Sequence, residues 1–232
     1  MSIKFKLLFP IFLQIILCFQ ELRAQDDFHH FYTDKSSDTF LSIEALSSRI
    51  EGPEIQMHLL NAAIFHFTNM ERKKEKLDVF VFNENLYKSS ALHSERMIVD
   101  DFFSHENKRQ RKWRTPKDRI FFYDDSYKTV GENILENFLL DYTGKTLRYR
   151  TEFDTNGSTI YLNPEGEVME NSTYMDLADR LVTQWMNSPP HRANILEKRF
   201  DLLACACEVN LDKTPILIRC TQNFGSFQSA TR

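Results

Sequence analysis

The chain has 232 residues and a formal net charge of −4, with charged residues spread along its length. Because there is no acidic tail, and no basic stripe beyond a solvated basic loop at 108–117, nucleic acid is not expected as a partner. The 20 phenylalanines against only 6 glycines indicate a sizeable core, in one large domain or a domain with extensions.

Residues 1–24 have the pattern of a secretory signal peptide. Two lysines precede an apolar run, Leu7–Phe19, which is too short to span a membrane, and cleavage is expected near Ala24. Cys18 lies in this run, but the leucine before it does not suit a lipoprotein cleavage site, which makes lipid anchoring the lesser reading. We therefore expect an exported protein, secreted or held in the periplasm or cell envelope, with no transmembrane segment.

The first half of the remaining chain predicts a leader and two long helices. Residues 25–53 have no sustained periodicity and are expected to pack loosely, with a short helix around 41–50. From Glu54, apolar residues recur at helical spacing and end in a basic Arg72-Lys73-Lys74, which suits a helix C-terminus. Asn83 is expected to cap the second helix.

The middle of the chain predicts a short helix and an inserted hairpin. Thr115 and Pro116 are typical of a helix start, and this helix should reach about Tyr123. Within 141–171, Asn-Gly and Glu-Gly turns flank an extended run, which predicts a β-hairpin over Thr151–Val168 on the surface.

A further helix should begin at Ser172 or Thr173 and carry Trp185. We expect it to break at Pro189-Pro190 and to restart after Arg192, because proline lacks a backbone donor and constrains the residue before it. His191 would then lie on a stiff turn.

Two strands, Leu202–Val209 and Pro215–Phe224, are expected to close the chain. Helices first, a short extended middle and a terminal hairpin predict an α+β domain over 54–228, with helices on both faces of a small antiparallel sheet.

Four polar residues are candidates for a functional site, and each also has a structural reading. His105 follows two phenylalanines, as partly buried structural histidines do, and Glu132 follows a glycine, as a solvated turn residue would. Ser188 lies three residues before His191, but no nucleophile elbow surrounds it, so a turn hydroxyl is the better reading. Two histidines and a carboxylate are the ligands of an open zinc site, and would serve equally as a polar cluster in a cleft.

In their order along the chain, six motifs together resemble the CAP superfamily of cysteine-rich secretory, antigen 5 and pathogenesis-related proteins, in its bacterial SCP-like branch. The motifs are Asn69–Arg72, Ala91–Met97, Phe102–His105, Gly131–Ile134, Trp185–Leu196 and Thr221–Gly225.

The resemblance implies an α-β-α sandwich with a central cleft lined by His105, Glu132 and His191. In the family such a cleft can hold a divalent cation, here zinc or magnesium. Ser188 stands where animal members carry a second glutamate, and three ligands with one anion hold a cation less tightly than four with two. Asn133 is expected beside the cleft, whereas Asn69, Arg72 and Trp185 are expected to be structural.

Three cysteines remain after the expected cleavage, which allows one disulfide with a leftover thiol, or three buried thiols. Because side chains alternate along a strand, those of Cys205, Cys207 and Cys220 would all point to the same face of the terminal hairpin. The register implied by the resemblance places Cys207 opposite Cys220 and leaves Cys205 free and buried. A shift by two residues would instead pair Cys205 with Cys220.

These observations favour a binding protein, because no nucleophile with an orienting base is evident. Its ligand would be a lipid, a small molecule, a divalent cation or a protein partner. The alternative is a metal-dependent hydrolase with Glu132 as the base acting on a bound water. A third possibility is a cell-envelope interaction module that uses the Thr151–Val168 hairpin.

Overall fold

The computed structural model describes residues 28–34, 36–51, 55–142 and 146–227. The predicted signal peptide, with Cys18, lies outside these residues. Within them, no helix is both long enough and apolar enough to cross a membrane.

A four-stranded sheet forms the centre of the molecule, with the strand order β1-β6-β7-β2. The bounds are Val81–Phe82 for β1, Tyr127–Phe138 for β2, Leu202–Asn210 for β6 and Leu217–Phe227 for β7. The predicted terminal hairpin is confirmed as β6 and β7. The prediction of an antiparallel sheet is wrong at one edge, where β1 pairs with β6 in parallel. The pattern also gave no sign of β2, because its buried positions include Glu132, Asn133 and Asn137, and these interrupt apolar alternation.

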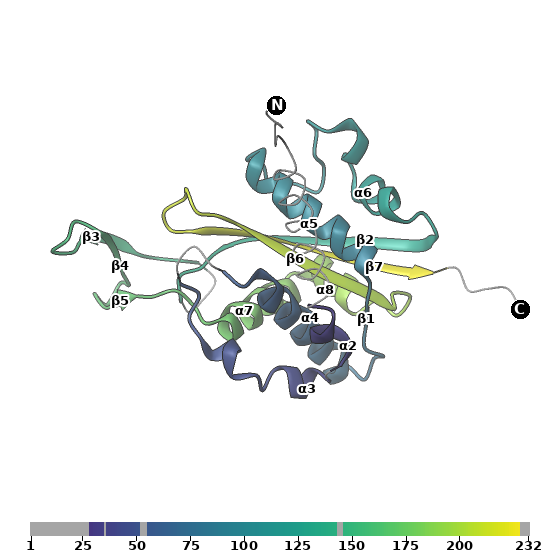
Figure 1. Cartoon of the computed structure of the whole chain (residues 1–232), viewed down its shortest axis with the longest axis horizontal. Helices are drawn as coiled ribbons and strands as arrows, with labels where there is room; N and C mark the ends of the chain where they lie inside the picture. Colours follow the sequence, from purple (N-terminus) through teal and green to yellow (C-terminus); the bar gives the residue numbers. More distant parts are fainter. Residues whose placement is uncertain (1–27, 35, 52–54, 143–145, 228–232) are drawn as a thin grey trace, which may run out of the picture.

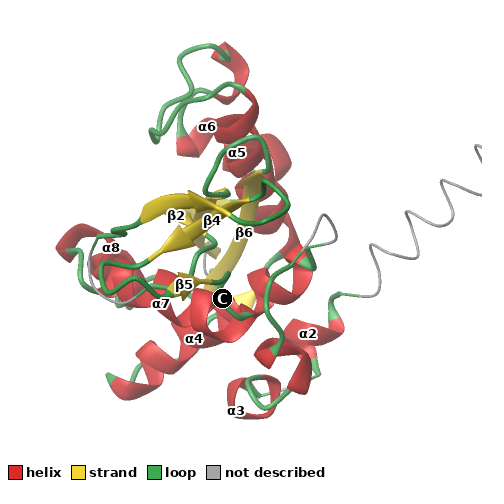
Figure 2. Ribbon diagram, turned by 90° about the vertical axis from the view of Figure 1, so that its left-hand side faces the viewer, coloured by secondary structure: helices red, strands yellow, loops and turns green. Residues whose placement is uncertain are grey.

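Helices cover both faces of this sheet, as the two views in Figures 1 and 2 show. One face carries α5 (Glu84–Val99) and α6 (Pro116–Tyr123), with the short 3-10 helix η2 (Arg111–Trp113) before α6. The other face carries α4 (Met57–Lys74), α7 (Tyr174–Met186) and α8 (Pro189–Ile195). The α+β fold, an α-β-α sandwich, is therefore confirmed.

The N-terminal leader packs against α4 and is not loose as expected. Its elements are α2 (His30–Thr33), α3 (Ser37–Phe40) and the 3-10 helix η1 (Glu44–Ser47), which are too short to show a hydrophobic period. Even so, Phe40, Leu46 and Ile50 are fully buried in the main core.

Three helices begin at the capping residues that the sequence predicts. The Asn83 side chain accepts the Leu86 N–H at 3.0 Å at the start of α5. Thr115 forms a capping box with Asp118, and Pro116 occupies the first turn of α6. Thr173 caps α7 by accepting the Asp176 N–H at 3.0 Å.

The predicted break between two helices is present, but it falls at Asn187 and Ser188, and the double proline begins the second helix instead of ending the first. Pro189 and Pro190 are the first two residues of α8, and Ser188 is its N-cap. The first turn of a helix needs no N–H partner and matches the fixed φ of proline, so two prolines suit it. His191 consequently lies in the first turn of α8 and not on a non-helical turn.

Residues of the predicted insertion form a second, three-stranded sheet that projects from the body of the molecule (Figure 1). Its strands are β3 (Arg150–Phe153), β4 (Thr159–Leu162) and β5 (Val168–Met169), in that order. A bridge between Leu140 and Asn171 joins the base of this sheet to the domain.

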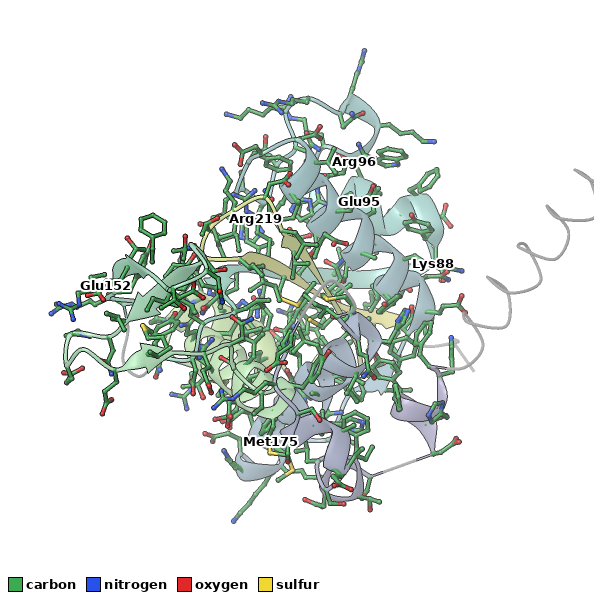
Figure 3. The ribbon with its side chains drawn as sticks, turned by 60° about the vertical axis from the view of Figure 1, so that its left-hand side comes forward. Lys88, Glu95, Arg96, Glu152, Met175 and Arg219 are labelled. Atoms are coloured by element: carbon green, nitrogen blue, oxygen red, sulfur yellow. A yellow bond between two sulfur atoms is a disulfide. The ribbon has the colours of Figure 1, made fainter. Side chains whose placement is uncertain are left out.

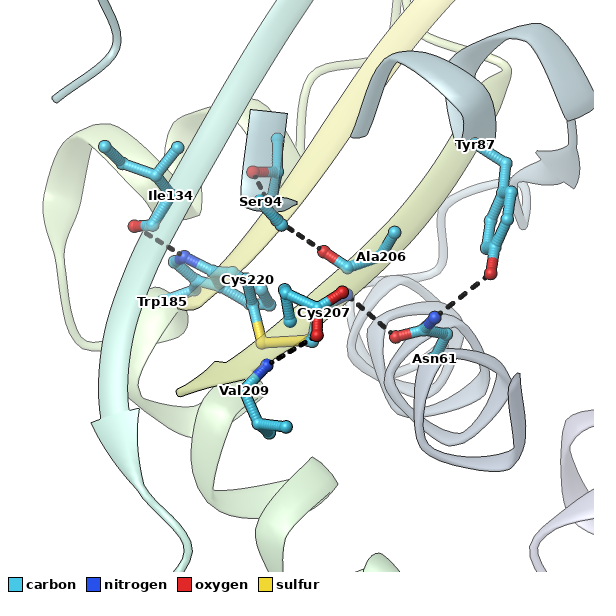
Figure 4. The surroundings of a disulfide bond; sticks show 11 residues. Asn61, Tyr87, Ser94, Ile134, Trp185, Ala206, Cys207, Val209 and Cys220 are labelled. Carbon is cyan, nitrogen blue, oxygen red and sulfur yellow. Dashed lines mark hydrogen bonds between the residues drawn. A yellow bond between two sulfur atoms is a disulfide. The ribbon is translucent and has the colours of Figure 1, made fainter. Parts of the chain in front are cut away.

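A disulfide joins Cys207 on β6 to the directly opposite Cys220 on β7 (Figure 4). This is the pairing implied by the family register. Cys205 is free and buried, and burial raises the pKa of its thiol, so it is an inert core residue. Beside the disulfide, Asn61 of α4 accepts the Cys207 N–H at 2.9 Å, which fixes α4 to the sheet.

Candidate functional site

Glu132 is the centre of a buried polar cluster on the α5–α6 face of the sheet. It lies on β2, opposite Asn223 of β7, and only 2% of its side chain is exposed. Its Oε1 lies 2.9 Å from Nδ1 of His105 and 3.8 Å from Nε2 of His93. With its amide turned to satisfy both ends, Asn223 donates to Oε2 at 3.2 Å.

Arg119 supplies the positive charge that balances this carboxylate. Its Nη2 donates to both oxygens of Glu132, at 2.7 and 3.0 Å, and to the His105 carbonyl at 3.0 Å. Its Nη1 donates to the carbonyls of Trp113 and Arg114. The side chain is 1% exposed, so the pair is a buried one that also fixes the loop before α6.

The two histidines of the cluster differ in solvent access. His93 is fully buried on α5, where its Nε2 donates to the Ser104 carbonyl at 3.1 Å. Its Nδ1 has no hydrogen-bond partner among the described residues. The His105 side chain is 47% exposed, so one ring edge binds Glu132 while the other faces solvent.

The electrostatics of the cluster favour a charged carboxylate beside a neutral His93. Burial alone would raise the pKa of Glu132, but the hydrogen bonds from His105 and Arg119, together with the charge of Arg119, lower it below its ordinary value. Burial lowers the pKa of His93 to about 4, despite the nearby carboxylate. Glu132 is therefore an anion that is already neutralised within the fold.

His191 approaches this cluster from the opposite face of the sheet. It lies on α8, and its carbonyl accepts the Asn133 amide at 3.2 Å. Burial, and then the charge of His105, lower the pKa of His191. His191 therefore contacts β2 through Asn133, whereas His105 contacts it through the neighbouring Glu132. In the described part of the chain, no hydrogen bond joins the His191 ring to Glu132.

Asn133 ties the sheet to α8. Its amide also donates to Gln222 Oε1 at 3.2 Å, and its oxygen accepts Asn194 Nδ2 at 2.8 Å. Asn194 further donates to the Glu132 carbonyl at 3.2 Å. A side chain at Gly131 would collide here, because its Cβ would lie 2.9 Å from the ring of Phe200.

Three residues expected to be structural make buried contacts. Asn69 exchanges two hydrogen bonds with the Phe80 backbone. Arg72 donates to the carbonyls of Asp78, Ile195 and Glu197, which joins α4 to the end of α8. Trp185 is fully buried and donates to the Ile134 carbonyl at 3.2 Å.

An open groove of the described surface lies away from the cluster. Ser188 lies at one end of this groove of about 1030 Å³, which runs between β2 and α7. His105, Glu132 and His191 do not line this groove. Ser188 makes no side-chain cap bond and has no histidine partner among the described contacts, which agrees with its reading as a turn residue.

The donor set does not suit a divalent cation as arranged here. Both Glu132 oxygens accept hydrogen bonds from the Arg119 guanidinium, which already balances the charge of the carboxylate. Within the described ranges, no group of three or more His, Cys, Asp or Glu residues is placed to hold a metal ion. Zinc or magnesium stays a prediction from the resemblance.

Sequence reasoning missed Arg119, His93 and Asn223. His93 falls on the buried stripe of α5, at +7 from Leu86 and −4 from Met97, and that spacing could have marked it as buried. Arg119 stands between Asp118 and Ile120 in a basic stretch, where nothing distinguishes a buried arginine from an exposed one.

Comparisons with known proteins agree with this architecture. The pattern of the family described as "CAP: Cysteine-rich secretory protein family" matches residues 65–224. The chain is 26% identical over 137 residues to the uncharacterized protein YkwD of Bacillus subtilis, a match that covers 59% of this chain and 38% of that protein.

Two solved structures are also similar. An outer surface protein of Borrelia burgdorferi has a TM-score of 0.51 at 17% identity, over 77% of this chain and all of that one. An extracellular SCP-domain protein of Bacillus anthracis has a TM-score of 0.49 at 22% identity, over 75% of this chain and 45% of that one. The chain thus spans less than half of the two Bacillus proteins.

Proposed function

The chain belongs to the cysteine-rich secretory protein family, and we propose that it is an exported, non-catalytic binding protein of that family. Export is supported by the sequence of residues 1–24, and the structural relatives are described as extracellular and outer surface proteins.

The observation that carries the proposal is that hydrogen bonds within the fold already occupy both carboxylate oxygens of Glu132. A general base must have a lone pair free to take a proton from water, and a metal ligand must have one free for the ion. Arg119, His105 and Asn223 use the carboxylate oxygens instead. The residue is therefore a structural anion, and the solvent-facing side of His105 is left for recognition.

The surface beside His105 indicates the class of ligand. Residues 108–117 contain no acidic residue, and all their basic side chains are exposed. These are Lys108, Arg109, Arg111, Lys112, Arg114 and Lys117. We call this stretch the basic segment.

Aromatic rings lie among these charges. Lys112 Nζ is 4.0 Å from the Phe122 ring centroid, and the Phe122 and Trp113 rings contact each other. Phe122 is 46% exposed, and Phe103, two residues before His105, is 47% exposed. Cations interleaved with exposed aromatic rings suit an anionic amphiphile, such as an acidic lipid.

Vesicle binding tests this proposal. Vesicles of phosphatidylglycerol with phosphatidylcholine should co-sediment with the protein, whereas vesicles of phosphatidylcholine alone should not. The variant R111E/K112E should bind at least about tenfold more weakly, because each basic residue near an anionic surface contributes about 1 kcal/mol. The binding should also weaken as salt rises.

The matched control is K198E/K213E, which changes the net charge equally at exposed sites away from the basic segment. Its binding should stay close to that of the wild type. Equal loss in both variants, or equal binding to both kinds of vesicle, would contradict the ligand class. Chelator-sensitive cleavage of a peptide or ester library that is lost in E132Q would favour the hydrolase instead.

A further inference from the structure

Strand β3 is a free edge of the projecting sheet. Figure 3 places Glu152, a residue of this strand, at the far end of that sheet from the domain body. β3 pairs with β4 on one side only, and all four of its side chains are exposed. Phe153 is 76% exposed, an unusual exposure for a large apolar residue on a strand edge.

The register shows which backbone groups face outward from this edge. The Asp154 N–H donates to the Ser158 carbonyl at 2.9 Å, and Glu152 lies opposite Ile160 in the same register. Hydrogen-bonded pairs alternate along an antiparallel ladder. The even-numbered residues of β3 therefore bond to β4, whereas the N–H and C=O of Thr151 and Phe153 point away from it.

The charges along this edge are ordered by sign. Residues 148–154 read Arg-Tyr-Arg-Thr-Glu-Phe-Asp, with both positive side chains before Thr151 and both negative ones after it. Because side chains alternate along a strand, Arg150 and Glu152 share one face of β3, and Thr151 and Phe153 share the other.

We propose that β3 pairs antiparallel with β3 of a second copy of this chain, centred on Thr151. The pairing uses the outward groups of the odd-numbered residues, and so completes the ladder. It is isologous, so each contact occurs twice. The opposing residues are Arg148 with Asp154, Tyr149 with Phe153, Arg150 with Glu152, and Thr151 with its own copy.

The charge pattern selects this register over its neighbours. Only odd-numbered residues have outward backbone groups, so odd-numbered residues must stay opposite odd-numbered ones. The smallest allowed shift slides one strand by two residues, which moves the symmetry centre by one residue, to Arg150 or to Glu152. Either move would place like charges directly opposite each other, which destabilises strand pairing. Charges on an edge strand ordinarily prevent such pairing, but here their order makes the edge complementary to itself.

Sedimentation equilibrium of the exported chain tests the pairing. The contact is small, so we expect a weak dimer with a Kd of roughly 0.1 mM. R150E and E152R should each sediment as monomers, because each places two like-charged pairs in the interface. An equimolar mixture of the two should form a heterodimer, and the double variant R150E/E152R should regain the homodimer.

T151P is a matched backbone test, because proline there removes an outward N–H and leaves the bonds to β4 intact. It should be monomeric with an unchanged thermal unfolding curve. The inference is wrong if the wild type is monomeric up to about 1 mM, or if it is a dimer that the single reversals do not weaken. It is also wrong if the mixture of reversals stays monomeric. The pairing is independent of vesicle binding through the basic segment.

Discussion

At the scale of single residues, the buried pair of Glu132 and Arg119 decides what the site can do. A buried carboxylate needs a counter-charge and hydrogen bonds. The fold supplies both from within, through Arg119, His105 and Asn223. A site built in this way has no need of a metal ion to neutralise the anion.

A double-mutant cycle measures this coupling. E132Q and R119M should each lower the free energy of unfolding by about 3–5 kcal/mol, because each leaves one buried charge without its partner. The double variant should lose clearly less than the sum. Urea unfolding gives all four values, and strictly additive losses would show that the two residues are not coupled.

His93 should make the protein sensitive to acid. Its pKa is about 4 in the folded state, against an ordinary 6.5. Between these values the unfolded chain binds a proton that the folded chain does not. His93 therefore does not reduce the free energy of unfolding above about pH 6.5. As the pH drops towards 4, its protonation in the unfolded chain lowers this free energy by about 3 kcal/mol in total.

The variant H93Q isolates this contribution, because glutamine keeps an N–H donor for Ser104 and does not titrate. Burial also lowers the pKa of His58, His66 and His191, so some acid sensitivity should remain in the variant. Unfolding free energies of wild type and H93Q at several pH values give the difference. Parallel pH profiles would rule out the assigned role of His93.

At the scale of elements, β2 and α8 meet where Gly131 leaves room. The Phe200 ring lies where a Gly131 side chain would be, and it stacks on Phe224. This close approach also lets Asn194 reach the Glu132 carbonyl. A glycine that looked like a turn residue in sequence is therefore a packing requirement inside a strand.

G131A should lower the free energy of unfolding by about 1–3 kcal/mol, as overpacking of a filled core does. In an F200L background the same substitution should cost less, because the smaller side chain leaves space for the methyl group. Thermal or urea unfolding of the four proteins provides the comparison. An equal cost in both backgrounds would contradict the contact with Phe200.

The elements that sequence predicted well are those with a local signal. Asn83, Thr115 and Thr173 mark helix starts because capping depends on neighbouring residues only. β2 was missed and the start of α8 was placed too late, for two different reasons. β2 buries polar residues that pair with distant partners, and Pro189-Pro190 suits a first helical turn as well as a break.

At the scale of the whole molecule, the fold was predictable and the state of the site was not. The ordered motifs indicated the family and the sandwich. They also named His105 and Glu132, which the structure places in contact. They could not show that Arg119 reaches Glu132, because this depends on where α6 packs across the sheet. That one contact is the reason why we propose a neutralised anion at a position where the resemblance implies a metal site.

Calorimetric titration with zinc tests the central claim most directly. We predict identical heats for the wild type and for H105A/H191A, because Arg119 and not a metal ion neutralises Glu132. A saturable heat of one zinc ion per chain that disappears in H105A/H191A would contradict the account.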